Sequence, residues 1–291
     1  MTKTYLAFDV GGTTIKYALV DSDLNITEPG KVDTKHNQDG HILKQLIEIS
    51  HQFQQKHLLS GIGVSTAGIV GNDGGILYAG PTIPNYQGTK IKQELEEATT
   101  LPVFVVNDVD AALLGEAVNG TAKETKNAYC IALGTGIGGA NLQNGKLISG
   151  QHNYANSIGY ILYEKETNTY YEQRASTLAL EAALKQYNVG VIEAFALAKS
   201  GDKFYTEILQ NWAYEVAKGL AEIVLLFDPE IIVIGGAVSQ QGDYLTNLLT
   251  EQLKQLVPEG LLKAKVKTAE LADQAQLLGA LSKFLKEEVE V

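Results

Sequence analysis

The chain has 291 residues, 45% of them hydrophobic and 20% charged, which suits about two packed domains and argues against intrinsic disorder or a fibrous protein. A formal net charge of −11 argues against a basic face, so we expect no nucleic-acid partner. Its single cysteine, Cys130, can form neither an intramolecular disulfide nor a multi-cysteine zinc site. With no signal peptide and no apolar run long enough for a membrane span, we expect a cytoplasmic protein without a membrane partner.

The first part of the chain predicts three strands, followed by alternating helices and strands. Apolar runs on either side of Gly11–Thr14 predict a hairpin with a tight glycine turn, and a third strand follows at 31–34. Helical spacing predicts a helix over 39–57 with Asp39 as its N-cap. The elements expected after it are a strand at 61–65, a helix near 91–99, a strand at 103–107 and a helix at about 110–118.

After residue 125 the same order starts again. The pattern gives a strand, the glycine turn Gly134–Gly139, a second strand, the type I′ turn Asn144-Gly145 and a third strand, at 128–133, 140–143 and 146–148. Helices near 175–187, 191–200 and 204–227 precede a strand at 231–234 that ends in Gly235-Gly236. We therefore predict an α/β fold of two similar lobes, 1–118 and 119–272, each a mixed sheet flanked by helices, with a cleft between them. A last helix at about 273–288 should pack back on the first lobe.

Asp9 ends the first predicted strand and directly precedes the first glycine turn. Successive N–H groups in such a turn can hold a phosphate, and a carboxylate beside it favours a divalent cation such as Mg²⁺ between the two. Taken alone, the pattern fits a plain hairpin, with Asp9 as a turn-forming residue, better than a phosphate site. The turn at Gly134 joins two strands, unlike a dinucleotide fingerprint, which opens a helix. Two such turns at equivalent places of a repeated fold favour phosphate binding.

Asn107 and Asp108 also end a predicted strand. An amide and a carboxylate at that place suit recognition of a hydroxyl group and removal of its proton, and phosphoryl transfer uses a carboxylate in this way. The local sequence fits another role equally well, because Asp108 could cap the following helix. Asp110 could also serve as that cap.

The sequence resembles the ROK family of sugar kinases and regulators, within the actin and hexokinase ATPase superfamily, along essentially the whole chain. The resemblance rests on seven ordered motifs: FDVGGTTIKYALVD, STAGIV, IPNYQG, VNDVDAALLGEAVNG, ALGTGIGGANLQNGKLISG, YEQRAS and FDPEIIVIGGAV. It implies two ribonuclease H-like lobes, a homodimer, and transfer of the γ-phosphoryl group of ATP, with Mg²⁺, to a sugar or glycoside hydroxyl. The primary hydroxyl at carbon 6 is the expected acceptor.

The same resemblance assigns site residues. The two phosphate loops and the adenosine site would use Asp9, Gly11, Gly12, Thr13, Thr14, Lys16, Gly134, Thr135, Gly136, Gly138, Gly235 and Gly236, with Asp9 beside the Mg²⁺ ion. The sugar would be held by Gly68, Asn85, Asn107, Asp108, Ser157, Tyr160 and Glu172, with Asp108 as the catalytic base.

The segment 156–160 departs from the family pattern. Members that resemble glucokinase have a Glu and a His where this chain has Ser157 and Tyr160, and they carry a zinc site where residues 161–171 contain no cysteine or histidine. We therefore expect no zinc. Tyr160 offers a face for a second ring, although packing is an equal alternative, and His152 nearby could contact substrate or be a plain loop residue.

Members that phosphorylate β-glucosides resemble this chain in carrying Tyr at the position of Tyr160. We expect a β-glucoside as substrate ahead of N-acetylmannosamine and free glucose. The alternative is a non-catalytic sugar sensor, since the family includes transcriptional repressors. Those resemble this chain only after a helix-turn-helix, whereas the first strand here starts near residue 4 and Asp9, Asp108 and both glycine turns are intact.

Overall fold

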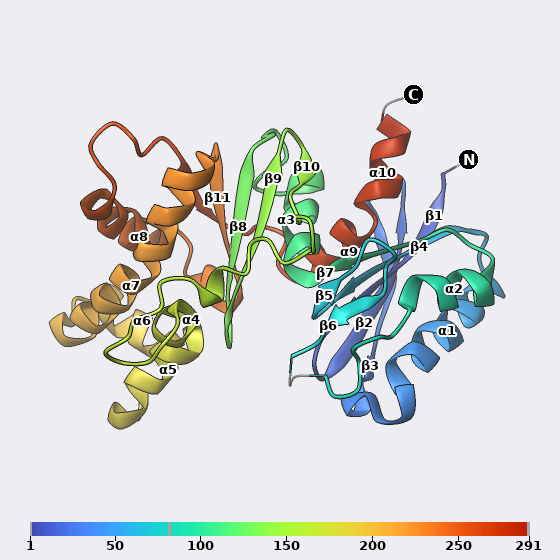
Figure 1. Cartoon of the computed structure of the whole chain (residues 1–291), viewed down its shortest axis with the longest axis horizontal. Helices are drawn as coiled ribbons and strands as arrows, with labels where there is room; N and C mark the ends of the chain where they lie inside the picture. Colours follow the sequence, from blue (N-terminus) through green and yellow to red (C-terminus); the bar gives the residue numbers. More distant parts are fainter. Residues whose placement is uncertain (1, 81–82, 290–291) are drawn as a thin grey trace. The chain divides into compact units, whose positions relative to one another are not determined.

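The structure is a computed structural model that describes residues 2–80 and 83–289. The chain forms two units, one of residues 1–120, 150–154 and 271–291 and one of residues 121–149 and 155–270. Each unit holds one five-stranded mixed sheet, and the strand order of the second repeats that of the first (Figure 1). The predicted α/β class and the internal repeat are therefore confirmed.

The sheet of the first unit has the order β3-β2-β1-β4-β7. Its strands are β1 (Thr4–Val10), β2 (Thr14–Asp21), β3 (Ile26–Asp33), β4 (Leu59–Thr66) and β7 (Val103–Asn107). The first three are antiparallel, and β1, β4 and β7 run parallel. Val10, Thr66 and Asn107 are register partners at the ends of the parallel strands. Asp9 and Asn107 therefore lie at the same edge of the sheet.

Alternation along β1 gives the first unit two cores, one on each face of the sheet. The helices of this unit are α1 (His41–Gln54), α2 (Ile91–Thr99), α3 (Asp108–Asn119), α9 (Gln274–Ala280) and α10 (Ser282–Val289). Leu6 and Phe8 are fully buried on one face with residues of α1 and α2, whereas Tyr5 and Ala7 pack on the other face with α9 and α10.

The C-terminal segment belongs to the first unit, where α9 packs against α3, β1 and β4 (Figure 1). The sequence predicts one helix here, but the helix is interrupted at Leu281, between α9 and α10. Two glycines allow α3 and α9 to approach closely, since a Cβ on Gly115 would collide with the Ala275 carbonyl and one on Gly279 with that of Ala111.

The sheet of the second unit has the order β10-β9-β8-β11-β12, with β8, β11 and β12 parallel. Its strands are β8 (Ala128–Leu133), β9 (Ile137–Gln143), β10 (Lys146–Leu147), β11 (Ile231–Gly235) and β12 (Lys265–Thr268). Its helices are α4 (Tyr171–Ala175), α5 (Thr177–Leu184), α6 (Val191–Lys199), α7 (Lys203–Phe227) and α8 (Asp243–Leu256). Tyr129, Ile131 and Leu133 of β8 share a buried core with residues of these helices.

Several local predictions need correction. Asp39 is not the N-cap of α1, because it has a positive φ of 53° and the helix starts after Gly40. The buried Asn37 side chain accepts from the Ile42 N–H instead, at 3.1 Å. The second glycine turn is shorter than expected, since β9 already begins at Ile137. The pattern of apolar residues in the sequence did not predict α8, β12 or a small hairpin of β5 (Ile69–Val70) and β6 (Ile76–Tyr78).

The turn Asn144-Gly145 is confirmed, since both residues have positive φ as a type I′ turn requires. Within the described residues, no helix combines the length and the apolar character that crossing a bilayer needs.

Candidate active site

The first glycine turn is fixed through its carbonyl groups. Thr34 donates from its hydroxyl to the Gly12 carbonyl at 2.8 Å and from its amide to the Thr13 carbonyl at 2.9 Å. Gly11 N–H donates to the Thr14 carbonyl at 2.9 Å and closes the hairpin. Because C=O and N–H of a trans peptide point in opposite directions, the amides of Thr13 and Thr14 are directed away from Thr34. Those amides are suitably placed to bind an anion.

Asp9 stands next to this turn, near the end of β1. Ser65, its register partner on β4, donates to Asp9 Oδ1 at 3.0 Å, and Lys16 is its partner on β2. Lys16 Nζ also lies 3.1 Å from the exposed Asp273 carboxylate. Burial raises the pKa of Asp9, while the Ser65 hydrogen bond and the Lys16 charge oppose that rise. Asp9 is thus a partly buried carboxylate beside a turn that can hold phosphate.

Asn107 is the N-cap of α3, a role that the sequence left to Asp108 or Asp110. Its Oδ1 accepts from the amides of Val109 and Asp110 at 2.9 and 3.2 Å, and its Nδ2 donates to the Gly68 carbonyl at 2.8 Å. Asp108 Oδ1 accepts from the Val109 amide at 2.9 Å. Asn107 therefore ties α3 to the loop after β4, and Asp108 occupies the first turn of the helix.

Two carboxyl groups at the start of α3 hold their protons unusually strongly. Burial, and after it the charge of Asp9, raises the pKa of Asp108 to about 6. Burial, and after it the charge of Asp108, raises the pKa of Asp110 to about 7. With a pKa of about 6, the Asp108 carboxylate is a better proton acceptor than an ordinary one and is still largely ionised near neutral pH. Among the predicted site residues, Asp108 has the properties of a general base.

The loop that carries Asn85 is held at the same edge of the sheet. Tyr86 and Thr66 hydroxyls lie 2.8 Å apart, and Thr66 is the register partner of Asn107. Asn37 donates to the Asn85 carbonyl at 3.1 Å. Asn85 is exposed and lines a cavity of about 680 Å³ with Ala79, Gly80, Ile83, Pro84, Tyr86, Gln87 and Gly88. Asp9, Gly68, Asn85, Asn107 and Asp108 are therefore grouped around the ends of β1, β4 and β7.

The second glycine turn follows β8 in the second unit. Gly134 N–H donates to the Gly136 carbonyl at 3.0 Å, and the Gly134 carbonyl accepts from the Leu178 amide at 3.2 Å. The Thr177 hydroxyl donates to the Leu133 carbonyl at 3.0 Å. The turn is therefore attached to the start of α5, where the first-turn amides of a helix carry partial positive charge.

The other predicted nucleotide residues lie around this turn. Gly236, with a φ of 89°, follows β11, and a Cβ there would collide with the Leu133 carbonyl, so the two chain segments touch. Gly235 ends β11 and Thr135 is exposed in the turn. Gly138 does not belong to the turn, because it lies within β9.

Glu172 of α4 lies against the second glycine turn. Its Oε2 accepts from the Ile137 amide at 3.1 Å, and a Cβ on Gly136 or on Gly159 would contact the same oxygen. Glycine at both positions therefore makes room for the carboxylate. Gly159 belongs to the short 3₁₀ helix Ile158–Tyr160, which packs on α4 and β9. The structure thus brings the segment 157–160 and Glu172 together.

Tyr160 is 58% exposed, which excludes a core position for its ring. The ring meets that of Tyr170 edge-on, with 5.8 Å between centroids, and Tyr170 in turn contacts Tyr163 at 5.2 Å. Ser157, just before the 3₁₀ helix, is exposed as well. These tyrosines form an accessible aromatic surface beside Glu172.

Arg174 holds the segment that carries this surface. Its Nη1 donates to the Thr169 carbonyl at 2.9 Å, its Nη2 to the Leu162 carbonyl at 2.7 Å, and its Nε lies 3.3 Å from Glu215 Oε2. A planar guanidinium can satisfy several acceptors at once in this way. Arg174 of α4 thus connects both ends of the segment 162–169 to α4, and its ion pair with Glu215 connects α4 to α7.

His152 lies in the stretch 150–154 that belongs to the first unit, whereas Ser157, Tyr160 and Glu172 belong to the second. It is exposed, and its ring is tilted against that of Tyr154 at 6.5 Å.

The donor groups around Asp9 suit Mg²⁺ better than a metal that needs several protein ligands. Over residues 2–80 and 83–289, no three His, Cys, Asp or Glu side chains are arranged to hold a metal ion. Mg²⁺ is commonly held by one or two carboxylates together with substrate phosphates and water. Asp9, a carboxylate next to a phosphate-binding type of turn, fits that mode.

Sequence reasoning missed several residues that shape the site. Strand pairing brings Ser65 to Asp9 and Thr34 to the first glycine turn. Asn37 donates a hydrogen bond to the carbonyl of Asn85, far along the chain. Such contacts leave no local signal. Arg174 lies inside the motif YEQRAS and Asp110 inside VNDVDAALLGEAVNG, where the charge of each is a signal visible in the sequence.

Known proteins resemble this chain over most of its length. The model of the ROK family matches residues 5–287. A glucokinase of Halalkalibacterium halodurans is 29% identical over 94% of this chain and 93% of its own. A beta-glucoside kinase of Listeria innocua is 29% identical over 97% of both chains.

Solved structures of ROK family proteins are also similar to this chain. A ROK family glucokinase from Streptomyces griseus, in complex with glucose and AMPPNP, has a TM-score of 0.81 and 26% identity over 98% of this chain and 99% of its own. A ROK family protein from Streptococcus pneumoniae, in complex with sucrose, has a TM-score of 0.86 and 26% identity over 99% of this chain and 100% of its own.

Proposed function

Because the chain belongs to the ROK family, we propose that it is an ATP-dependent sugar kinase that phosphorylates the carbon 6 hydroxyl of a hexose or hexoside, with a β-glucoside preferred. The carbohydrate-kinase class follows from the kinase relatives and from the glucokinase structure with a bound ATP analogue. The observation that carries the proposal is Asp108, a carboxylate of raised pKa at the same sheet edge as Asp9 and the first glycine turn.

Asp108 acts as the general base. It accepts the proton of the sugar hydroxyl as the oxygen attacks the γ-phosphorus atom, and the bond between that atom and ADP breaks. Asn107 cannot turn freely, since both ends of its amide are hydrogen bonded, so it holds the start of α3 in position. Asp108 is therefore presented from a rigid helix terminus, which favours a defined geometry for proton transfer.

Each glycine turn offers backbone amides to phosphate, the first together with Lys16 and the second together with the start of α5. Gly235 and Gly236 lie near the adenosine. Asp9 would hold Mg²⁺, which neutralises phosphate charge when bound. Without that ion Asp9 would repel the phosphates, so its position next to the turn suits a metal-bound nucleotide.

The preferred substrate follows from the surface beside Glu172. Ser157 and Tyr160 are exposed there, and the exposed tyrosine ring can stack on a second sugar ring or another group at carbon 1. Two comparisons support a substituted substrate: a relative is a beta-glucoside kinase, and a ROK family structure holds the disaccharide sucrose. N-acetylmannosamine and free glucose are the competing substrates.

The test is a sugar panel. Measuring kcat/KM for cellobiose, a simple β-glucoside, N-acetylmannosamine and glucose by coupled ADP release, at the same ATP and Mg²⁺ concentrations, should rank the β-glucosides first. If glucose exceeded every glycoside tenfold, about 1.4 kcal/mol in transition-state binding, the β-glucoside preference would be wrong. If neither these sugars nor any other hexose caused ADP release, the kinase assignment itself would be contradicted.

The proposal includes a homodimer. Light scattering on the purified protein should then give about twice the 31.4 kDa of one chain. A mass of one chain at all concentrations would contradict it.

A further inference from the structure

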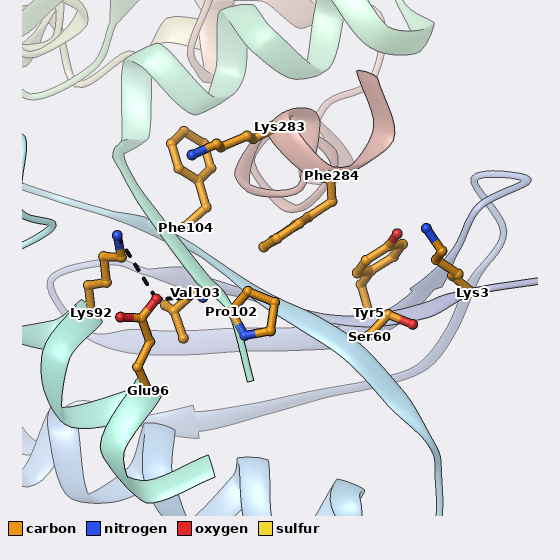
Figure 2. Close-up of a pocket in the computed structure, with 10 residues that line it drawn as sticks. All are labelled: Lys3, Tyr5, Ser60, Lys92, Glu96, Pro102, Val103, Phe104, Lys283 and Phe284. Carbon is orange, nitrogen blue, oxygen red and sulfur yellow. Dashed lines mark hydrogen bonds and ion pairs between the residues drawn. The ribbon is translucent and has the colours of Figure 1, made fainter. Parts of the chain in front are cut away.

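A cavity of about 570 Å³ lies in the first unit, at the edge of the sheet opposite to Asp9 (Figure 2). Ser60 of β4 and Val103 of β7 line it at the beginnings of their strands, and Lys3 lines it just before β1. The parallel strands run from here to the candidate active site over about six residues, roughly 20 Å at 3.3 Å per residue. The cavity is therefore separate from the site of Asp9 and Asp108.

Three lysines from different parts of the chain line this cavity. Lys3 precedes β1, Lys92 belongs to α2 and Lys283 to α10. Among the lining residues that the structure describes, the one acidic residue is Glu96, whose Oε1 accepts from the Val103 amide at 3.2 Å and lies 3.9 Å from Lys92 Nζ (Figure 2). A pair this long between partly exposed side chains is weak, so Lys92 can turn to another anion. The described lining therefore has an excess of two positive charges, in a chain of net charge −11.

Apart from Ser60, apolar side chains form the rest of the described lining, three of them aromatic. Tyr5 and Phe284 are stacked, with 5.3 Å between ring centroids and 15° between ring planes, and Phe104 and Pro102 lie across from them (Figure 2). The volume is within the range of small-molecule sites. Aromatic faces next to cationic groups suit a ligand that has both a ring and an anionic group.

We propose that this cavity is a second ligand site, which binds a small organic phosphate monoester through the lysines and its ring through the aromatic lining. A phosphate monoester carries a charge of about −1.5 to −2 at neutral pH, which matches the excess charge of the lining. Sugar phosphates and nucleoside monophosphates share this chemistry. The site does not depend on the proposed kinase activity, since none of its residues belongs to the candidate active site.

Lysine acetylation read by mass spectrometry tests the site directly. The full-length protein is treated with an amine-reactive acetylating reagent alone and with saturating hexose 6-phosphate, adenosine monophosphate or inorganic phosphate. We expect at least one organic phosphate to slow modification of Lys92 and Lys283 at least about threefold, because a bound anion shields their amines. Lys44, exposed on α1 and outside the cavity, is the internal control and should react at an unchanged rate.

Two variants test the contributions of the lysine charges and of the aromatic lining separately. Lys92→Gln with Lys283→Gln should weaken binding of the protecting compound, measured by calorimetry, at least about tenfold, while Lys44→Gln leaves it unchanged. Phe104→Leu should weaken binding of the organic phosphate and leave that of inorganic phosphate unaltered.

Three results would overturn the proposal. The first is equal protection of Lys92, Lys283 and the control Lys44, or protection of none of them, with every compound. The second is protection by inorganic phosphate that equals that of the organic phosphates and survives Phe104→Leu. The third is protection by an acidic peptide with none by the phosphates, which would make this surface a peptide-binding site. Loss of kinase activity in the sugar panel would leave the acetylation result intact, so the two proposals can fail separately.

Discussion

Glu172 Oε2 accepts a hydrogen bond from the backbone amide of Ile137 at 3.1 Å. This contact joins the residue expected to bind the sugar to the strand that follows the second glycine turn. A carboxylate that serves both as a local acceptor and as a ligand for substrate should show two separable effects on mutation.

Glu172→Gln and Glu172→Ala separate them. Both should raise the KM for the sugar at least about tenfold, since a charge-assisted hydrogen bond contributes roughly 1.5–3 kcal/mol. Only the alanine variant should also lower Tm, because Gln keeps an acceptor for the Ile137 amide and Ala does not. Steady-state kinetics and calorimetry on the two variants check this, and a wild-type KM in Glu172→Gln would restrict Glu172 to a structural role.

Asp108→Asn should lower kcat by at least about 10²-fold, the lower range for general-base catalysis, with sugar binding still measurable. Asparagine keeps an oxygen that can accept from the Val109 amide, so the start of α3 should survive. Asp110→Asn, two residues along the same helix turn, is the matched control and should lower kcat much less. Near-normal turnover in Asp108→Asn would remove this residue from the mechanism.

Asp110→Asn should stabilise the protein at high pH and leave it unchanged at low pH. The folded pKa of about 7 lies above the ordinary value of 3.8, so between these values the folded state holds a proton that the unfolded state has lost. The free energy of unfolding therefore falls as pH rises through this window, and the neutral variant escapes the loss.

We expect Asp110→Asn to raise Tm by a few degrees at pH 8, since 1 kcal/mol of stability corresponds to about 2–4 °C, and to leave Tm unchanged at pH 4. Both measurements are made without Mg²⁺. Asp23→Asn, at an exposed carboxylate, should show no such pH-dependent gain. An equal Tm difference at both pH values would show that the charge of Asp110 is not what destabilises the folded state.

Gly279→Ala should destabilise the first unit by about 1–3 kcal/mol, because the new Cβ would collide with the Ala111 carbonyl of α3, a backbone atom that cannot move aside. Thermal unfolding measures the effect. At Gly190 a Cβ meets nothing within 4 Å, so Gly190→Ala should cost much less. Equal losses in the two variants would contradict the close approach of α3 and α9.

Chelation of zinc should leave folding and activity intact once Mg²⁺ is restored, because residues 161–171 contain neither cysteine nor histidine to ligate zinc. Hydrogen bonds of Arg174 support the segment 162–169 instead. Elemental analysis and Tm before and after chelation check the point. Stoichiometric zinc whose removal lowers Tm would show that other residues bind it.

The sequence by itself determined the repeated order of strands and glycine turns, the α/β class and the positions of Asp9 and Asp108 at strand ends. These features are local, since apolar alternation, turn residues and strand ends are read within a few positions along the chain. The Asn144-Gly145 turn was predictable for the same reason, because its positive φ angles select those two residue types.

Only the tertiary structure decided which groups meet. The Ser65 bond to Asp9, the Asn107 bond to Gly68 and the return of α9 to α3 join residues far apart in the chain. The cap of α3 was predicted at Asp108 or Asp110, but Asn107 takes the role, because its amide also donates to the Gly68 carbonyl of a distant loop. The raised pKa of Asp108 also depends on burial and on Asp9, which the fold alone brings near it.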